Sequence, residues 1–139
     1  MKLSVKQIIE AASALRSAKA NTLDDAVRLR IVKIRAALKG EAEAYQSFDE
    51  DLVKTMKGGD FDDLAARAQA KTLSGEELAR WNAEAMRYGS AVGSARAEYL
   101  AREVEVADFP KLGEEDVLKL LKENDWPWSF YDALEVIIR

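Results

Sequence analysis

The sequence predicts an all-α protein, a long antiparallel helical hairpin with short flanking helices and room for one small two-stranded pairing. Two long stretches carry apolar residues at alternating spacings of four and three. Such spacing places the residues on one stripe of a helix, called here a heptad seam. Only two prolines and seven glycines interrupt 139 residues, so little in the chain opposes helix. We predict a single helical domain over residues 1–139.

The first long stretch runs from Thr22 to about Lys57, with Asn21 or Thr22 expected to cap its first turn. Glu41 is the one polar residue in its seam. Gly40 lies in the middle of this stretch and lowers the stability of a helix by about 1 kcal/mol relative to alanine. We expect the helix either to continue through Gly40 or to kink there. The apolar seam residues are Val27, Ile31, Ile34, Leu38, Tyr45, Phe48 and Leu52.

The second long stretch opens at Ser74, whose spacing from Glu77 is that of a capping box. Two long helices joined by a shorter element should fold back on each other in an antiparallel hairpin. Gly89 and Gly93 leave the middle of this helix without large side chains. We interpret this as room for close packing within the chain rather than as a specific dimer contact. The second seam consists of Leu78, Trp81, Ala85, Tyr88, Val92, Ala95 and Tyr99.

The flanking segments carry shorter signals. Ser4 and Gln7 have the spacing of a capping box and open a short helix that reaches about Ser17. The alternating stretch 103–106 (Glu-Val-Glu-Val) predicts either a short strand beside Leu3 or a continuation of the preceding helix. Ser129 is the expected cap of the last helix, which runs almost to the C-terminus.

The composition limits the chemistry available to the chain. The net charge is -4, and there is neither cysteine nor histidine, which removes thiolate chemistry and the commonest metal ligand and general base. Asp60, Asp62 and Asp63 begin like a calcium loop, but Leu64 stands where the third oxygen ligand belongs. We therefore expect no enzyme, no cofactor and no metal site.

The predicted location is the cytoplasm of a host cell or a virion. The first residues lack the apolar run of a signal peptide, and no apolar run is long enough to span a bilayer. We expect no membrane partner.

Two groups of residues are candidates for interaction. The aromatic cluster Trp126, Trp128, Phe130 and Tyr131 either closes the end of a helical bundle, the interpretation we favour, or anchors an interface. The basic group lies on one face of the first long helix, and its members are Arg28, Arg35 and Lys39. A basic face can bind nucleic acid, but the acidic balance of the chain argues against that and favours a solvated face or a partner complement.

The order of the segments resembles that of a family of small uncharacterised proteins encoded in bacteriophage and prophage genomes, described only as hypothetical or structural proteins. The resemblance rests on an opening helix at 3–9, a long helix with the stretches 29–35 and 43–45, and an acidic-apolar stretch at 103–106. A terminal helix ending at 133–138 completes it. The segment from Gly58 to about Arg80 lies outside the resemblance, which brings no catalytic or binding residues with it.

The resemblance implies a virion or assembly component that works by self-association or by binding another phage protein. We therefore expect a non-enzymatic structural or assembly protein that associates through its helices. The alternative is a small regulatory or adaptor protein that binds nucleic acid through the basic helix face.

Overall fold

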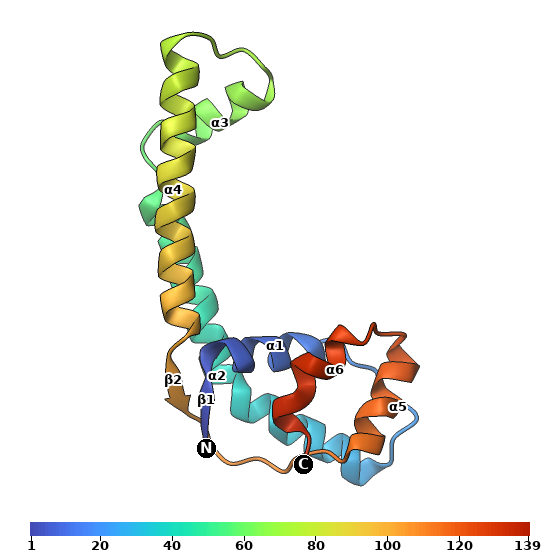
Figure 1. Cartoon of the computed structure of the whole chain (residues 1–139). Helices are drawn as coiled ribbons and strands as arrows, with labels where there is room; N and C mark the ends of the chain where they lie inside the picture. Colours follow the sequence, from blue (N-terminus) through green and yellow to red (C-terminus); the bar gives the residue numbers. More distant parts are fainter. The chain divides into compact units, whose positions relative to one another are not determined.

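The computed structural model describes all 139 residues and contains six α-helices and one two-stranded antiparallel sheet (Figure 1). This confirms the predicted all-α class with a minor strand pairing. The chain divides into two compact units. Unit 1 comprises Met1–Tyr45 and Leu100–Arg139, and unit 2 comprises Gln46–Tyr99.

Unit 1 contains most of the secondary-structure elements. They are β1 (Lys2–Ser4), α1 (Val5–Leu15), the first part of α2 (Asp25–Met56), β2 (Glu103–Glu105), α5 (Glu114–Asn124), α6 (Ser129–Leu134) and a final 3₁₀ turn (Glu135–Ile137). Unit 2 contains the rest of α2, α3 (Phe61–Gln69) and α4 (Glu76–Leu100).

Helix α2 runs through Gly40 without interruption for 32 residues. Its first turn is capped by Asp24, whose Oδ1 accepts a hydrogen bond from the backbone N–H of Val27 at 2.9 Å. The prediction that Asn21 or Thr22 caps this helix is therefore wrong. The backbone N–H groups of those two residues instead donate to the carboxylate of Glu123 on α5, at 2.9 and 2.5 Å.

The core of unit 1 is a continuous apolar cluster contributed by every helix of the unit. The first four seam residues of α2 are buried in it, as the periodicity predicts. Helix α1 packs against α6, and α5 packs against α6. The largest fully buried side chains of the unit are Ile8, Leu15, Ile34, Leu38, Leu112, Leu120, Leu134 and Ile137.

Short backbone pairings hold both chain ends in unit 1. Strand β1 pairs antiparallel with β2, with Leu3 opposite Val104, so the strand alternative for residues 103–106 is the correct one. The Ser4–Gln7 capping box forms as predicted and starts α1 directly after β1. At the other end, Leu112 forms a parallel bridge with Ile138.

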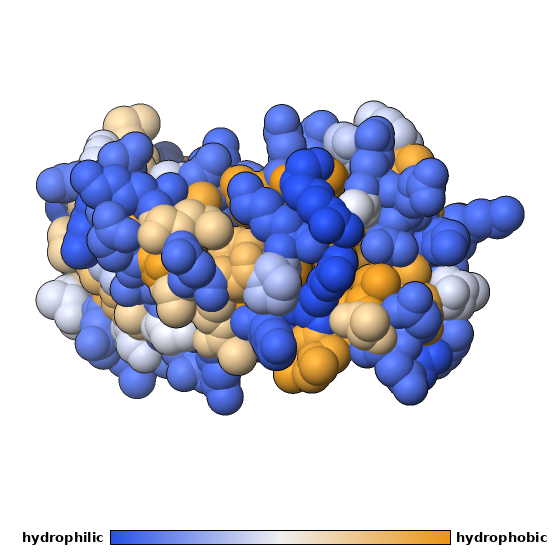
Figure 2. Space-filling view, turned by 90° about the horizontal axis from the view of Figure 1, so that it is seen from below, coloured by the Kyte–Doolittle hydropathy of each residue, from blue (hydrophilic) through white to orange (hydrophobic).

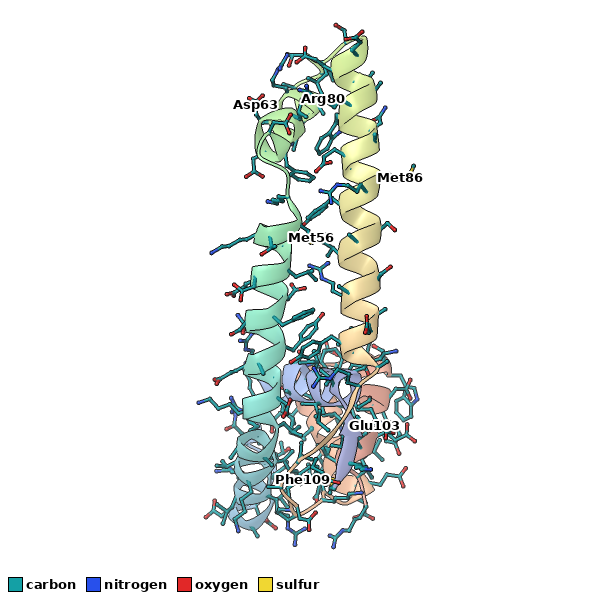
Figure 3. The ribbon with its side chains drawn as sticks, turned by 90° about the vertical axis from the view of Figure 1, so that its left-hand side faces the viewer. Met56, Asp63, Arg80, Met86, Glu103 and Phe109 are labelled. Carbon is teal, nitrogen blue, oxygen red and sulfur yellow. The ribbon has the colours of Figure 1, made fainter.

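Unit 2 is an antiparallel pair formed by the end of α2 and by α4, with α3 between them in the chain (Figure 3). Its buried apolar side chains are Phe61, Leu64 and Val92. The Phe61 ring meets those of Trp81 and Tyr88, with centroids 5.1 and 4.7 Å away. Most of the second seam is therefore only half buried, because a two-helix layer covers one side of each helix.

Ion pairs supply much of the remaining contact in unit 2. The guanidinium of Arg96 binds both carboxylate oxygens of Asp49, at 2.5 and 3.1 Å, and Arg67 binds both oxygens of Glu77, at 2.6 and 3.0 Å. The Glu77 carboxylate is thus turned towards α3, and α4 begins at Glu76 after Gly75, which has φ +56°. The predicted Ser74–Glu77 capping box is wrong for this reason.

Candidate interaction surface

The aromatic segment of unit 1 is positioned by the end of α5. That helix stops at Asp125, which adopts the left-handed conformation with φ 52°. The backbone N–H of Trp126 then donates to the carbonyl of Leu121 at 3.0 Å, the bond expected after a left-handed C-terminal residue. The chain turns through Pro127, and α6 starts at Ser129 with Trp128 as the preceding residue. The expected cap by the Ser129 side chain is therefore wrong.

The four predicted aromatic residues form two stacked pairs rather than one cluster. The Trp126 and Phe130 rings lie 4.6 Å apart at 16°, and the Trp128 and Tyr131 rings lie 5.0 Å apart at 2°. Three of the four, all except Trp128, are partly buried against the core of unit 1. Trp128 is 65% exposed. The core interpretation therefore describes three of these residues, and Trp128 is the exception.

The Trp128–Tyr131 pair is held in place by a polar contact. The Tyr131 hydroxyl donates to a carboxylate oxygen of Glu114, at the start of α5, at 3.2 Å. Burial of the ring, together with this hydrogen bond, raises the pKa of the Tyr131 hydroxyl above its ordinary value of 10.0. The phenol therefore stays protonated at neutral pH, and the indole stacks on a ring that is hydrogen-bonded to α5.

A shallow groove of about 260 Å³ lies between α1 and α6. Glu10, Ser13 and Ala14 line it from α1, and Ser129, Phe130 and Ala133 line it from α6. Trp128 directly precedes Ser129, but neither Trp128 nor Tyr131 lines this groove. The α1 residues of this surface carry no distinctive sequence pattern, and we did not predict them.

The predicted basic residues of α2 are largely engaged within unit 1. The Arg28 guanidinium donates to the carbonyls of Ala20, Leu23 and Asn21 at 3.0–3.2 Å. Arg35 donates to the carbonyl of Arg16, just past the end of α1, at 3.4 Å. These contacts satisfy carbonyl groups of the loop between α1 and α2, and a cation near a helix C-terminus is also favoured by the helix dipole.

Lys39, the third basic candidate, forms an exposed ion pair with Glu43 one turn along α2, at 3.8 Å. The structure does not gather Arg28, Arg35 and Lys39 into a set of unengaged cations.

Two exposed apolar residues of α2 were missed by the sequence analysis. Leu29 is 53% exposed and Val32 is 59% exposed. Both are large apolar residues at helix positions outside the heptad seam. Apolar residues at such positions are the sequence signal that could have identified them. On the face shown in Figure 2, apolar residues form several separate patches among hydrophilic side chains.

A scan of the chain against protein-family models, a search of curated proteins and a search of solved structures each found no match. None of the helices combines the length and the apolar character that crossing a membrane requires.

Proposed function

We propose that this protein is a non-enzymatic structural or assembly protein of a phage or prophage, and that it acts by binding another protein chain through its helices. The partner is a second copy or another protein of the same phage. The observation that carries the proposal is the exposed indole of Trp128, stacked on Tyr131.

An exposed, pre-positioned tryptophan is the kind of residue that dominates protein interfaces. Tryptophan and tyrosine are enriched among the residues that carry most of the binding free energy. The stack on Tyr131 and the hydrogen bond to Glu114 restrict the aromatic pair before any partner arrives. Binding therefore loses less side-chain entropy than it would with a freely rotating indole.

The groove between α1 and α6 supplies a second place for an apolar side chain of the partner. Phe130 and Ala133 offer apolar surface, while Glu10, Ser13 and Ser129 contribute polar groups to the lining. An apolar contact bordered by polar groups is the usual composition of a protein–protein interface. The phage assignment draws its support from the resemblance in the order of segments.

The mass of the protein in solution tests this function directly. Light scattering behind a sizing column, over about a hundredfold range of concentration, should show a discrete oligomer or, with other structural proteins of the same phage added, a mixed complex. A protein that stays monomeric at tens of micromolar and binds none of those proteins would contradict the proposal.

A substitution at the aromatic pair locates the surface. Trp128→Ala should weaken the association with the partner protein at least about tenfold, because it removes the largest exposed apolar side chain of this surface. Leu118→Ala on α5 is the matched control, since Leu118 is also an exposed apolar residue of unit 1, at 39%. Equal effects of the two changes would argue against Trp128 as the anchor.

A further inference from the structure

The side of α2 that lies opposite its buried seam has no partner in unit 1. This outer face of α2 consists of Leu29, Val32, Lys33, Ala36, Gly40 and Glu43, and all six residues are exposed. Their spacing keeps them on one stripe of the helix over four turns. Two large apolar side chains one turn apart, each more than half exposed, are the main apolar content of the stripe.

The middle of the outer face is slim, and no contact within the chain explains why. A Cβ added at Gly40 would meet no atom within 4 Å, so the glycine is not needed to fit a neighbouring element. A glycine in a helix interior nonetheless costs about 0.5–1 kcal/mol relative to alanine. Ala36, one turn before Gly40, extends the narrow section and would let the backbone of another helix come close.

The charges on the outer face are arranged in a self-complementary way. Lys33 lies three residues before Ala36, and Glu43 lies three residues after Gly40. If a second α2 packs antiparallel with its Gly40 against Ala36, then Lys33 of each copy faces Glu43 of the other. A two-fold interface requires this kind of self-complementarity, because the same patch must serve on both copies.

The same arrangement selects the direction of packing. A parallel in-register pair would place Lys33 beside Lys33 and Glu43 beside Glu43, and such like-charge contacts are destabilising. The existing Lys39–Glu43 pair does not compete strongly, since its two side chains are 71% and 65% exposed and such surface pairs contribute little.

We propose that the outer face of α2 binds the same face of a second copy of this chain in an antiparallel two-fold dimer, with Ala36 against Gly40 and Lys33 against Glu43. The proposal rests on the self-association part of the proposed function and assigns the partner for a surface distinct from the Trp128–Tyr131 pair. The two surfaces together would give one protein an isologous contact and a separate contact for another chain.

Enlarging the slim section is the first test. Gly40→Leu should weaken dimerisation at least about tenfold, measured by sedimentation velocity across a concentration series, because leucine prevents close approach. The variant should still fold, since the site is open and leucine favours helix more than glycine does. Its thermal midpoint, measured at a concentration where the wild type is monomeric, verifies this.

Gly93→Leu is the matched control. Gly93 is also an exposed glycine inside a long helix, α4, and a Cβ added there meets no atom within 4 Å. This change should leave dimerisation unaltered. A dimer that is lost in Gly93→Leu and retained in Gly40→Leu would overturn the proposal and place the interface on α4.

A charge exchange provides a second, independent test. Lys33→Glu and Glu43→Lys should each weaken the homodimer at least about tenfold at low salt, because each change creates two like-charge contacts. The double variant should dimerise again, and so should an equimolar mixture of the two single variants, in which every lysine meets a glutamate. Failure of both rescues would overturn the antiparallel register.

The outcomes separate this inference from the proposed function. A wild-type oligomer that is insensitive to Gly40→Leu and to both charge changes overturns the α2 dimer and leaves association through Trp128 standing. A wild-type monomer at tens of micromolar that still binds another phage protein also overturns only the dimer. A monomer that binds nothing overturns both. Trp128→Ala should leave the α2 dimer intact.

Discussion

Unit 1 and unit 2 are built from helices of similar periodicity but are held together differently. All the buried apolar side chains outside Phe61, Leu64 and Val92 belong to unit 1, where all of them except Val5 form one continuous cluster. Unit 2 relies on ring contacts around Phe61 and on the ion pairs Asp49–Arg96 and Glu77–Arg67. The difference follows from the number of layers, because a helix pair alone leaves most of each helix in water.

The comparison shows that a heptad seam predicts which residues share a face of the helix but not how deeply that face is buried. On α2, Ile34 and Leu38 are fully buried because α1, α5 and α6 complete the core around them. On α4, Leu78 occupies an equivalent seam position and is 42% exposed. Stability should therefore differ between the units, with unit 2 opening more readily.

The largest effect is expected from truncating the core of unit 1. Leu120→Ala should lower the free energy of unfolding by about 4 kcal/mol, because the side chain is fully buried and the surrounding cluster cannot collapse into the space. Leu118→Ala, on the exposed side of the same helix, should cost about 1 kcal/mol or less. Chemical denaturation measures both, and similar losses would mean that the core of unit 1 is not closely packed.

A smaller and more local effect is expected in unit 2. Phe61→Ala should cost about 3 kcal/mol by removing the ring on which Trp81 and Tyr88 pack. Amide hydrogen exchange should speed up in α3 and α4 while the amides of α1 and α5 keep their protection. Met86→Ala is the control, since Met86 is 77% exposed and points away from the helix pair (Figure 3). Uniform acceleration across both units would show that they unfold together.

The ion pairs of unit 2 predict a dependence on pH. The hydrogen bonds from Arg67 hold the pKa of the Glu77 carboxyl below its ordinary value of 4.5. The contribution of this carboxylate to stability is therefore complete above pH 4.5 and is lost as the pH falls through the lowered pKa. The Glu77→Gln variant should be less stable than the wild type at pH 7. In thermal melts, the difference in midpoint between the two proteins should shrink as the pH falls. A difference that is constant with pH would contradict the role of the charge.

The smallest effect concerns the glycines within the long helices. Gly40→Ala should raise the stability of α2 by about 0.5–1 kcal/mol, because the site is open and alanine loses less entropy in a helix. Gly93→Ala should give a similar gain that is confined to unit 2. Hydrogen exchange in α4 tests this, and a gain that spreads equally to α1 would mean that the units are not independent.

Part of the candidate surface could be predicted from the sequence. The aromatic composition of the segment 126–131 identified it as a candidate, but its division into three partly buried rings and one exposed indole depends on the left-handed turn at Asp125 and on contacts with distant helices. The basic face of α2 was predicted from spacing alone. The carbonyls that engage Arg28 and Arg35 belong to a loop whose path no local pattern specifies.

The sequence by itself determined the helices and the Ser4–Gln7 cap, because these depend on spacings of a few residues. For residues 103–106 it left a strand and a continued helix open, and the pairing with β1 decided for the strand. Only the tertiary structure decided which seam is buried, why Asp24 rather than Asn21 or Thr22 caps α2, and why Glu77 binds Arg67 instead of capping α4. In each of these cases, either several groups compete for the same polar partner or several helix faces compete for burial against apolar side chains. Such competitions are settled by neighbours that folding brings together, as when Glu123 accepts the N–H groups of Asn21 and Thr22 about a hundred residues earlier in the chain.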